Sequence, residues 1–186
     1  MRAKVRKEKK KWIRVVGPSF LHGQLLGESY ASHASDLIGR RLDLNISYLT
    51  GDIKRQNVIL GFRIIEAKGS DAYADIISYS MVNAYVKRIV RAGKDKIDDS
   101  FTVETKDKFF LRIKPVMLVK SKTKNSTLTT LRALARENFS KLAHTHDLKM
   151  ILDGVISGKI QRDLKQLLNK IYPLNVFEIR KLDIVR

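Results

Sequence analysis

The sequence predicts an α+β protein: an antiparallel β-barrel or strongly curled sheet, with a helical layer packed beside it and a basic N-terminal arm. Three observations lead to this fold class. Apolar and polar residues alternate in short runs over much of residues 12–122, as in half-buried strands. Apolar residues recur at helical spacing over 126–171, and residues 174–185 return to a strand-like composition. We expect this last strand to join the earlier sheet, which makes 12–186 a single α+β domain.

The first eleven residues form a basic segment. They hold seven Lys or Arg residues and one acidic residue, Glu8. Because so few apolar side chains cannot offset the entropy of ordering the backbone, we predict that residues 1–11 are an arm that is disordered until it meets a partner.

Three alternating runs predict the first strands. From Gly39 to Tyr48, every second residue from Leu42 onward is apolar or aromatic and falls on one face. A second run extends from Val58 to Ile64 and a third from Tyr73 to Tyr79, with turn residues between them. Short strands at such close spacing favour a barrel, because closure removes exposed strand edges.

A short helix and a hairpin follow. Between Ser80 and Gly93 the apolar spacing becomes helical, with Ser80 as the expected N-cap and Gly93 as the expected end. Residues 101–119 alternate again and predict a hairpin that turns at 106–108. Pro115 lies in its second strand and lacks a backbone N–H, so we predict a sheet edge or a β-bulge there.

The helical layer begins after a basic loop over residues 120–126. Three apolar stripes predict helices that begin near Leu128, at Asp147 and near Ile160. Asp147 is a favoured N-cap residue type. The third helix is expected to end at Tyr172, because the residue before a proline is disfavoured in the α conformation.

The charge balance indicates a polyanionic partner. The chain holds 37 Lys and Arg against 19 Asp and Glu, a formal net charge of +18 on 186 residues. Self-repulsion of this size is relieved when phosphates neutralise it, which favours nucleic acid, with an acidic membrane surface as the alternative. There is no cysteine, which excludes disulfides and thiolate-held metals. No apolar run approaches the roughly 20 residues that span a bilayer, so we expect a soluble protein.

The candidate RNA-binding residues are cations in flexible or extended segments, together with one aromatic residue beside them. They are Arg2, Lys4, Arg6, Lys7, Lys9, Lys10, Lys11, Trp12, Arg40, Arg41, Arg88, Arg91, Lys94, Lys96, Lys120, Lys122 and Lys124. Each group has a simpler alternative. The arm could only solubilise, the cations near the end of the predicted helix could only stabilise its dipole, the loop could only be solvated, and Trp12 could belong to the core.

No catalytic site is predicted. The sequence holds no P-loop, nucleophile elbow or dinucleotide fingerprint. His144 and His146 flank Thr145 and could share one face of a strand, but no cysteine accompanies them and Asp147 fits an N-cap better than a ligand. We therefore expect no metal, no cofactor and no enzymatic activity.

Four blocks of the sequence resemble one family. GRRLDLNISYLTGD at 39–52, RAGKDKID at 91–98, FFLRIKPVMLVKSK at 109–122 and YPLNVFEIRKLDI at 172–184 are similar in order and spacing to the small-subunit ribosomal protein family "S-one-e", also called "S-three-A-e", of archaea and eukaryotes. The resemblance extends from about Trp12 to the C-terminus and indicates an archaeal member. Two departures are Tyr48, where an acidic residue is common, and the end of the chain at Arg186, where many members continue.

The resemblance implies a structural constituent of the small ribosomal subunit. It implies a β-barrel core beside helices, a place on the platform near the messenger exit, and a cytoplasmic, ribosome-bound protein. The implied partners are the 3′ region of the small-subunit rRNA, neighbouring small-subunit proteins and, near the exit, mRNA. From charge alone, a free RNA-binding translation or RNA-processing factor and a metal-dependent RNA-processing enzyme remain alternatives.

Overall fold

The computed structural model describes residues 9–21, 23–90 and 93–185. Backbone contacts divide the chain into two compact units, Met1–Ile77 and Ser78–Arg186. The single domain expected over 12–186 stays a prediction.

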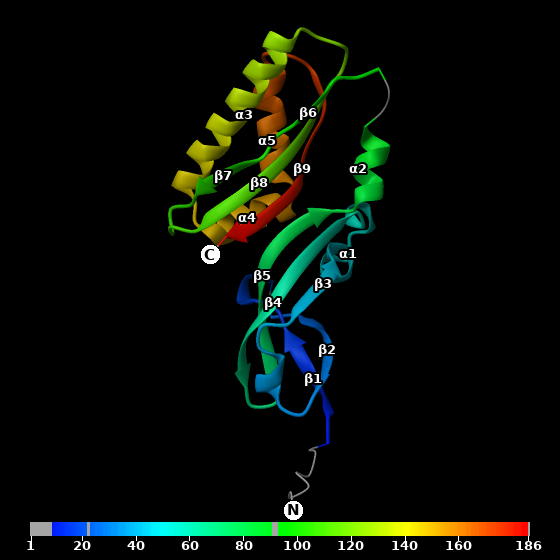
Figure 1. The fold of residues 1–186 in the computed structure, drawn as a ribbon, viewed down its shortest axis with the longest axis vertical. Helices are drawn as coiled ribbons and strands as arrows, with labels where there is room; N and C mark the ends of the chain where they lie inside the picture. The colour runs from blue at the N-terminus through cyan, green and yellow to red at the C-terminus, as the bar shows by residue number, and fades with distance from the viewer. Residues whose placement is uncertain (1–8, 22, 91–92, 186) are drawn as a thin grey trace, which may run out of the picture. The chain divides into compact units, whose positions relative to one another are not determined.

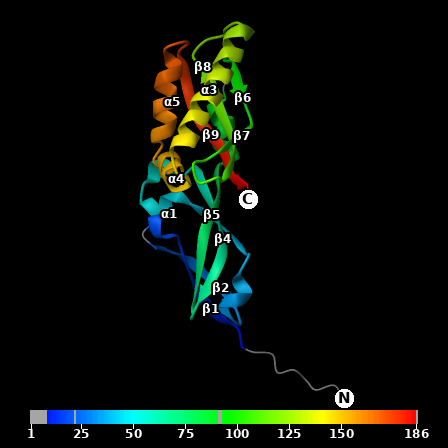
Figure 2. The same cartoon turned by 90° about the vertical axis from the view of Figure 1, so that its left-hand side faces the viewer.

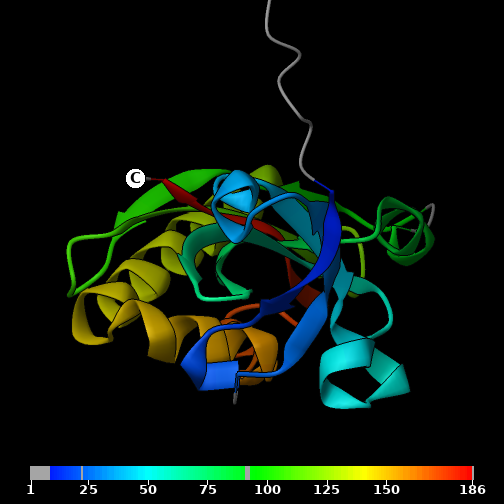
Figure 3. The same cartoon turned by 90° about the horizontal axis from the view of Figure 1, so that it is seen from below.

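The N-terminal unit is mainly β-structure (Figure 1). Its elements are β1 (Lys11–Val16), η1 (Ser19–Leu21), β2 (Leu25–Ala31), η2 (Ala34–Leu37), β3 (Arg41–Asn45), α1 (Ile46–Thr50), η3 (Ile53–Arg55), β4 (Val58–Lys68) and most of β5 (Asp71–Met81). Strand β1 pairs with β2 in antiparallel fashion and with β5 in parallel at Val15 and Ala72. Strand β4 pairs with β3 and with β5, and Figure 3 shows how strongly β4 and β5 curve.

Alternation along β4 builds the core of this unit, as the sequence pattern predicts. Val58, Leu60, Phe62 and Ile64 are all buried, and Ile13 of β1 is buried with them. Because every second residue of β4 is apolar, the strand register places all of these side chains on one face of the sheet, which is buried.

The run from Gly39 to Tyr48 is a strand for only part of its length, which corrects the sequence prediction. Strand β3 ends at Asn45, whose side-chain oxygen accepts a hydrogen bond from the Ser47 backbone N–H and caps helix α1. Gly51 ends this helix with a φ of 70°. Tyr48, expected on the buried face of a strand, lies on the helix and is 85% exposed.

The C-terminal unit consists of strands and a layer of helices. Its elements after the last residues of β5 are α2 (Asn83–Ile89), β6 (Lys96–Asp98), β7 (Phe101–Glu104), β8 (Phe110–Val119), α3 (Asn125–Thr145), α4 (Leu148–Ile156), α5 (Lys159–Asn169) and β9 (Leu174–Val185). Strand β9 pairs with β8 from end to end, and Ser78 to Ser80 of β5 pair with β9 on its other side. Helices α3, α4 and α5 cover one face of β7, β8 and β9 (Figures 1 and 2).

Of the two predicted forms, a closed antiparallel barrel and a strongly curled sheet, the barrel is wrong, and the sheet is not antiparallel throughout. Within the described residues, the main path of the sheet runs β2-β1-β5-β9-β8-β6 and does not close on itself. The β1–β5 pairing is parallel, since the chain passes through three strands before it returns beside β1. The α+β class itself is correct.

The start of one helix differs from prediction, and another helix begins where predicted but without the expected capping hydrogen bond. Helix α2 has Val82 as its N-cap, in place of Ser80, and ends at Ile89 before Gly93. Asp147 is the N-cap residue of α4, but its side chain makes no capping hydrogen bond. Asp107, in the turn between β7 and β8, instead accepts a hydrogen bond from the Leu148 backbone N–H at 3.2 Å.

Pro115 lies in the interior of β8, at the point where the partner strand changes. Strand β7 pairs with residues Phe110 to Ile113 of β8, and β6 pairs with Val116 to Leu118. The register with β9 shifts between Lys114 and Pro115, which confirms the predicted bulge. The missing N–H therefore falls where neither β6 nor β7 needs a donor.

An ion pair joins the β6–β7 connection to helix α3. The Arg136 guanidinium donates two hydrogen bonds to the Asp99 carboxylate and lies over the Phe101 ring at 5.9 Å from its centroid. The Asp99 side chain is only 6% exposed, whereas that of Arg136 is 49% exposed. The hydrogen bonds from Arg136 lower the pKa of Asp99, against a smaller opposing effect of burial.

This lowered pKa predicts a loss of stability in acid. A carboxylate with a depressed folded-state pKa stabilises the fold above its ordinary value of about 3.8, and the contribution disappears as the pH falls through the lower folded value. We expect Asp99→Asn to lower the free energy of unfolding by about 1.5 kcal/mol at neutral pH, the low end for a hydrogen bond to a charged group because Arg136 is half exposed. Urea unfolding from pH 7 down to about pH 3 should show this difference shrinking in acid.

Glu137→Gln is the matched control on the same helix. It breaks the exposed pair with Lys141, and an exposed pair contributes little to stability. A difference between wild type and Asp99→Asn that stays constant down to about pH 3 would contradict the assignment.

Candidate nucleic-acid interface

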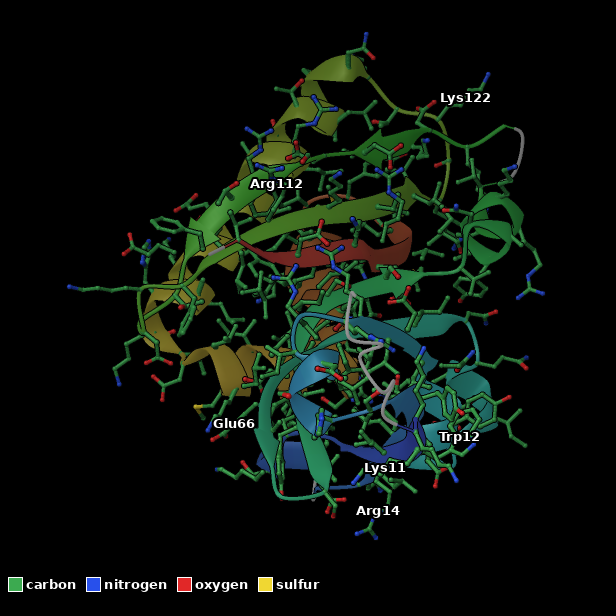
Figure 4. All side chains as sticks on the ribbon, turned by 60° about the horizontal axis from the view of Figure 1, so that its bottom comes forward. Lys11, Trp12, Arg14, Glu66, Arg112 and Lys122 are labelled. Carbon is green, nitrogen blue, oxygen red and sulfur yellow. The ribbon has the colours of Figure 1, made fainter. Side chains whose placement is uncertain are left out.

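The structure places the predicted RNA-binding residues in both units. Arg2, Lys4, Arg6, Lys7 and Arg91 lie outside the described residues, so the predicted arm stays a prediction. Lys9 and Lys10 precede β1, and Lys11 is the first residue of that strand. Figure 4 labels Lys11, Trp12 and Arg14 along β1 and Lys122 in the loop after β8.

In the N-terminal unit, an aromatic pair lies among cations on β1 and β2. Trp12 lies opposite Tyr30 in the strand register, and their ring centroids are 5.2 Å apart. The Lys10 ammonium lies 5.9 Å from the centroid of the Tyr30 ring, and Arg40 donates to the Tyr30 carbonyl oxygen at 3.4 Å. We call Lys10, Trp12, Tyr30 and Arg40 the aromatic–basic patch.

Two arginines face each other on β3 and β4. Arg41 lies directly opposite Arg63 in the antiparallel register, and the Arg63 Nε has no hydrogen-bond partner within the described residues. Like charges opposite each other in a sheet repel, so an anion between them would stabilise the strands. Arg14, by contrast, is engaged by Asp71 at 3.2 Å.

In the C-terminal unit, Lys120, Lys122 and Lys124 project from a loop that is anchored at two points. All three lysines are exposed. The Asp95 carboxylate accepts a hydrogen bond from the Thr123 backbone N–H at 2.9 Å, and the Tyr172 hydroxyl lies 2.9 Å from the Ser121 hydroxyl. Helix α3 begins at Asn125, within the predicted loop 120–126, and we call the remaining residues 120–124 the basic loop.

The β6–β8 pairing brings a second predicted cluster beside the basic loop. Lys96 lies opposite Leu118, and the Val119 N–H donates to the Asp95 carbonyl oxygen at 3.2 Å. Lys94 and Lys96 are therefore neighbours of the strand end from which the basic loop begins. Lys96 already has an acidic partner, because its ammonium lies 2.5 Å from Asp98. Arg88, on α2, instead lies over the Tyr85 ring at 5.2 Å from its centroid.

The uncovered face of β8 and β9 adds cations that the sequence reasoning missed. Lys114 lies opposite Lys181, and Arg112 lies opposite Asp183 (Figure 4 labels Arg112). The Asp183 carboxylate forms an ion pair with Lys181 at 2.9 Å, so Lys181 has an acidic partner on its own strand. Strand alternation could place Arg112 and Lys114 on one face, but only the register shows that Lys181 faces them.

The two histidines near the end of α3 have different surroundings. His146 Nδ1 lies 3.0 Å from the Leu142 carbonyl oxygen and 2.8 Å from the Thr145 hydroxyl at the end of α3, while His144 is exposed. Within the described ranges, no three His, Asp or Glu side chains are grouped as metal ligands would be. In the same ranges, no helix is long and apolar enough to span a membrane.

The fold and these surfaces define a strongly basic α+β protein whose cations lie on sheet faces and on an anchored loop. The chain belongs to the Ribosomal S3Ae family, which it matches over residues 2–186. The resemblance drawn from its four sequence blocks is confirmed.

Curated relatives agree with this assignment. A small ribosomal subunit protein eS1 from Halorubrum lacusprofundi is 30% identical over 176 residues, which cover 95% of this chain and 82% of the relative. The protein of the same name from Desulfurococcus amylolyticus is 32% identical over 172 residues, covering 92% and 81%. These relatives are archaeal, as expected. Because the family consists of ribosomal proteins, the chain is a structural protein and not an enzyme.

The anchoring of the basic loop can be tested at Tyr172. Tyr172→Phe removes the hydroxyl that contacts Ser121 and the Lys122 carbonyl oxygen, and we expect a loss of about 0.5–1.5 kcal/mol of local stability. Hydrogen exchange of the amides in residues 120–124 should be faster by the corresponding factor. Tyr48→Phe, which changes an exposed phenol, is the control and should leave that exchange unchanged. Unchanged exchange in Tyr172→Phe would show that the hydroxyl does not hold the loop.

Proposed function

We propose that this protein is a structural constituent of the small ribosomal subunit and binds small-subunit rRNA. The observation that carries the proposal is the family match over residues 2–186. The net charge of +18 supports it, because the phosphates of a polyanion can neutralise the cations of each unit.

The finer proposal places the protein on the platform of the subunit, near the messenger exit. Its partners there are the 3′ region of the rRNA, neighbouring small-subunit proteins and the mRNA that leaves through the exit, and its compartment is the cytoplasm. The support is the resemblance of the four sequence blocks to a family with this location.

Phosphate is the chemical group that the basic surfaces fit. Arg41 and Arg63 present two guanidinium groups from adjacent strands, and a guanidinium can form paired hydrogen bonds with phosphate oxygens. The lysines of the basic loop are point charges, and the loop that carries them is held by the Asp95 carboxylate at the Thr123 N–H and by the Tyr172 hydroxyl at Ser121. Contacts of this kind fix position and orientation on RNA without reading sequence.

Sedimentation through a high-salt wash tests the structural role. We expect the protein to remain with purified small subunits at close to one copy per subunit, because a constituent makes many simultaneous phosphate contacts. A protein that the wash removes would be a visiting RNA-binding factor, and this result would overturn the proposal.

The basic loop should account for a measurable part of the salt dependence of RNA binding. Replacing Lys120, Lys122 and Lys124 by Gln should reduce the slope of log affinity against log salt concentration by about 2 to 3 units, one contact for each lysine. Labelled small-subunit rRNA fragments and fluorescence anisotropy at several salt concentrations give this slope.

A triple variant of equal charge change is the control. Lys68, Lys106 and Lys141 each pair with a carboxylate, so their replacement by Gln should change the slope much less. Equal slopes for the two triple variants would show that net charge alone, and not the basic loop, determines the salt dependence.

A further inference from the structure

We propose that Trp12 and Tyr30 form a stacking site for an unpaired base of RNA. The inference rests on the proposed function, which it makes more specific. Ring faces attract bases of any sequence, so this site would hold a single-stranded or splayed-out nucleotide, whereas the arginine and lysine surfaces contact only phosphates.

The Trp12 and Tyr30 rings lie outside the core of the N-terminal unit. Their strand neighbours Ile13 and Ala31 point inward and are buried, whereas Trp12 is 67% exposed and Tyr30 is 48% exposed. The contact between the two rings covers only part of each, so much of two large aromatic side chains stays in water. An exposed aromatic pair of this kind is typical of a binding surface.

The geometry of the pair leaves ring surface free for a ligand. The planes of Trp12 and Tyr30 are tilted by 48°, so the two rings do not stack face to face on each other. Their direct opposition in the β1–β2 register fixes both side chains on one face of rigid strands. A base can therefore stack on either ring without first separating a stacked pair.

The charges around the pair favour a nucleotide over a neutral apolar ligand. Lys10 lies over the Tyr30 ring, and Arg40 donates a hydrogen bond to the Tyr30 carbonyl oxygen. Lys11 precedes Trp12 in the sequence. Two acidic residues lie close by: Glu28, two residues from Tyr30, lies opposite Arg14 in the register, and Asp71 forms an ion pair with the same Arg14. Phosphates on either side of a stacked base would meet these cations, whereas the apolar face of a partner protein would have to desolvate them.

The tryptophan itself reports on the site, because Trp12 is the only tryptophan in the chain. Stacking on a base changes indole fluorescence directly. The probes are a short single-stranded oligoadenylate, the same strand in a duplex with oligouridylate, and an abasic strand of equal length. We expect saturable quenching by the unpaired strand, and little by the duplex or the abasic strand at equal phosphate concentration.

Substitutions separate stacking from general apolar contact. Trp12→Ala should weaken oligoadenylate binding by about 5- to 150-fold, the range measured for the loss of one aromatic–base stack. Trp12→Phe and Tyr30→Phe should retain most of the affinity, whereas Trp12→Leu should not. Tyr48→Ala, which removes another exposed ring of the same unit, is the control and should bind as wild type does.

Three results would overturn the inference: equal quenching by the abasic strand, full affinity of Trp12→Leu, or an equal loss in Tyr48→Ala. The salt-wash experiment separates these failures from failure of the proposed function. Wild-type protein that stays on washed subunits but shows no quenching by unpaired RNA lacks the stacking site and keeps its structural role. Wild-type protein that washes off the subunits contradicts the structural role itself.

Discussion

The antiparallel pairing of β8 with β9 is the constraint on which the C-terminal unit depends. It runs from Phe110 and Val185 at one end to Val119 and Leu174 at the other, so the last strand of the chain closes onto a strand formed more than fifty residues earlier. Helix α5 packs on β9 and α3 packs on β7, and both therefore take their positions from this ladder. The anchored loop starts where β8 ends, and Tyr172, which holds it, comes just before β9.

Part of the positive charge is balanced within the protein. Several cations are matched internally, as Arg136 is by Asp99 and Arg14 is by Asp71. Other cations lie opposite a second cation on the neighbouring strand, as Lys114 lies opposite Lys181. Apolar contacts on the buried face of the same two strands offset this repulsion. Phosphate binding would remove that repulsion, so the same residues that weaken the free protein would strengthen its complex.

Local patterns predicted the elements better than the contacts between them. Period-two alternation located β4 and its buried face, and Pro115 located a bulge, because both depend on neighbouring residues alone. The sequence reasoning missed the end of β3. The alternating pattern continues to Tyr48, but the Asn45 side chain caps a helix that begins at Ile46. Trp12 was a candidate from the sequence, whereas Tyr30 could be found only from the β1–β2 register. That the sheet is open could be seen only from strand pairings between distant residues, such as the parallel pairing of β5 with β1.

The bulge at Pro115 also separates the two short strands that pair with β8. Pro115 has no N–H, so it donates no hydrogen bond between the part of β8 that pairs with β7 and the part that pairs with β6. Its carbonyl oxygen accepts a hydrogen bond from the Asp99 backbone N–H at 3.4 Å, and the Asp99 carboxylate binds Arg136 of α3. The two-residue connection between β6 and β7 therefore joins the bulge to the helical layer.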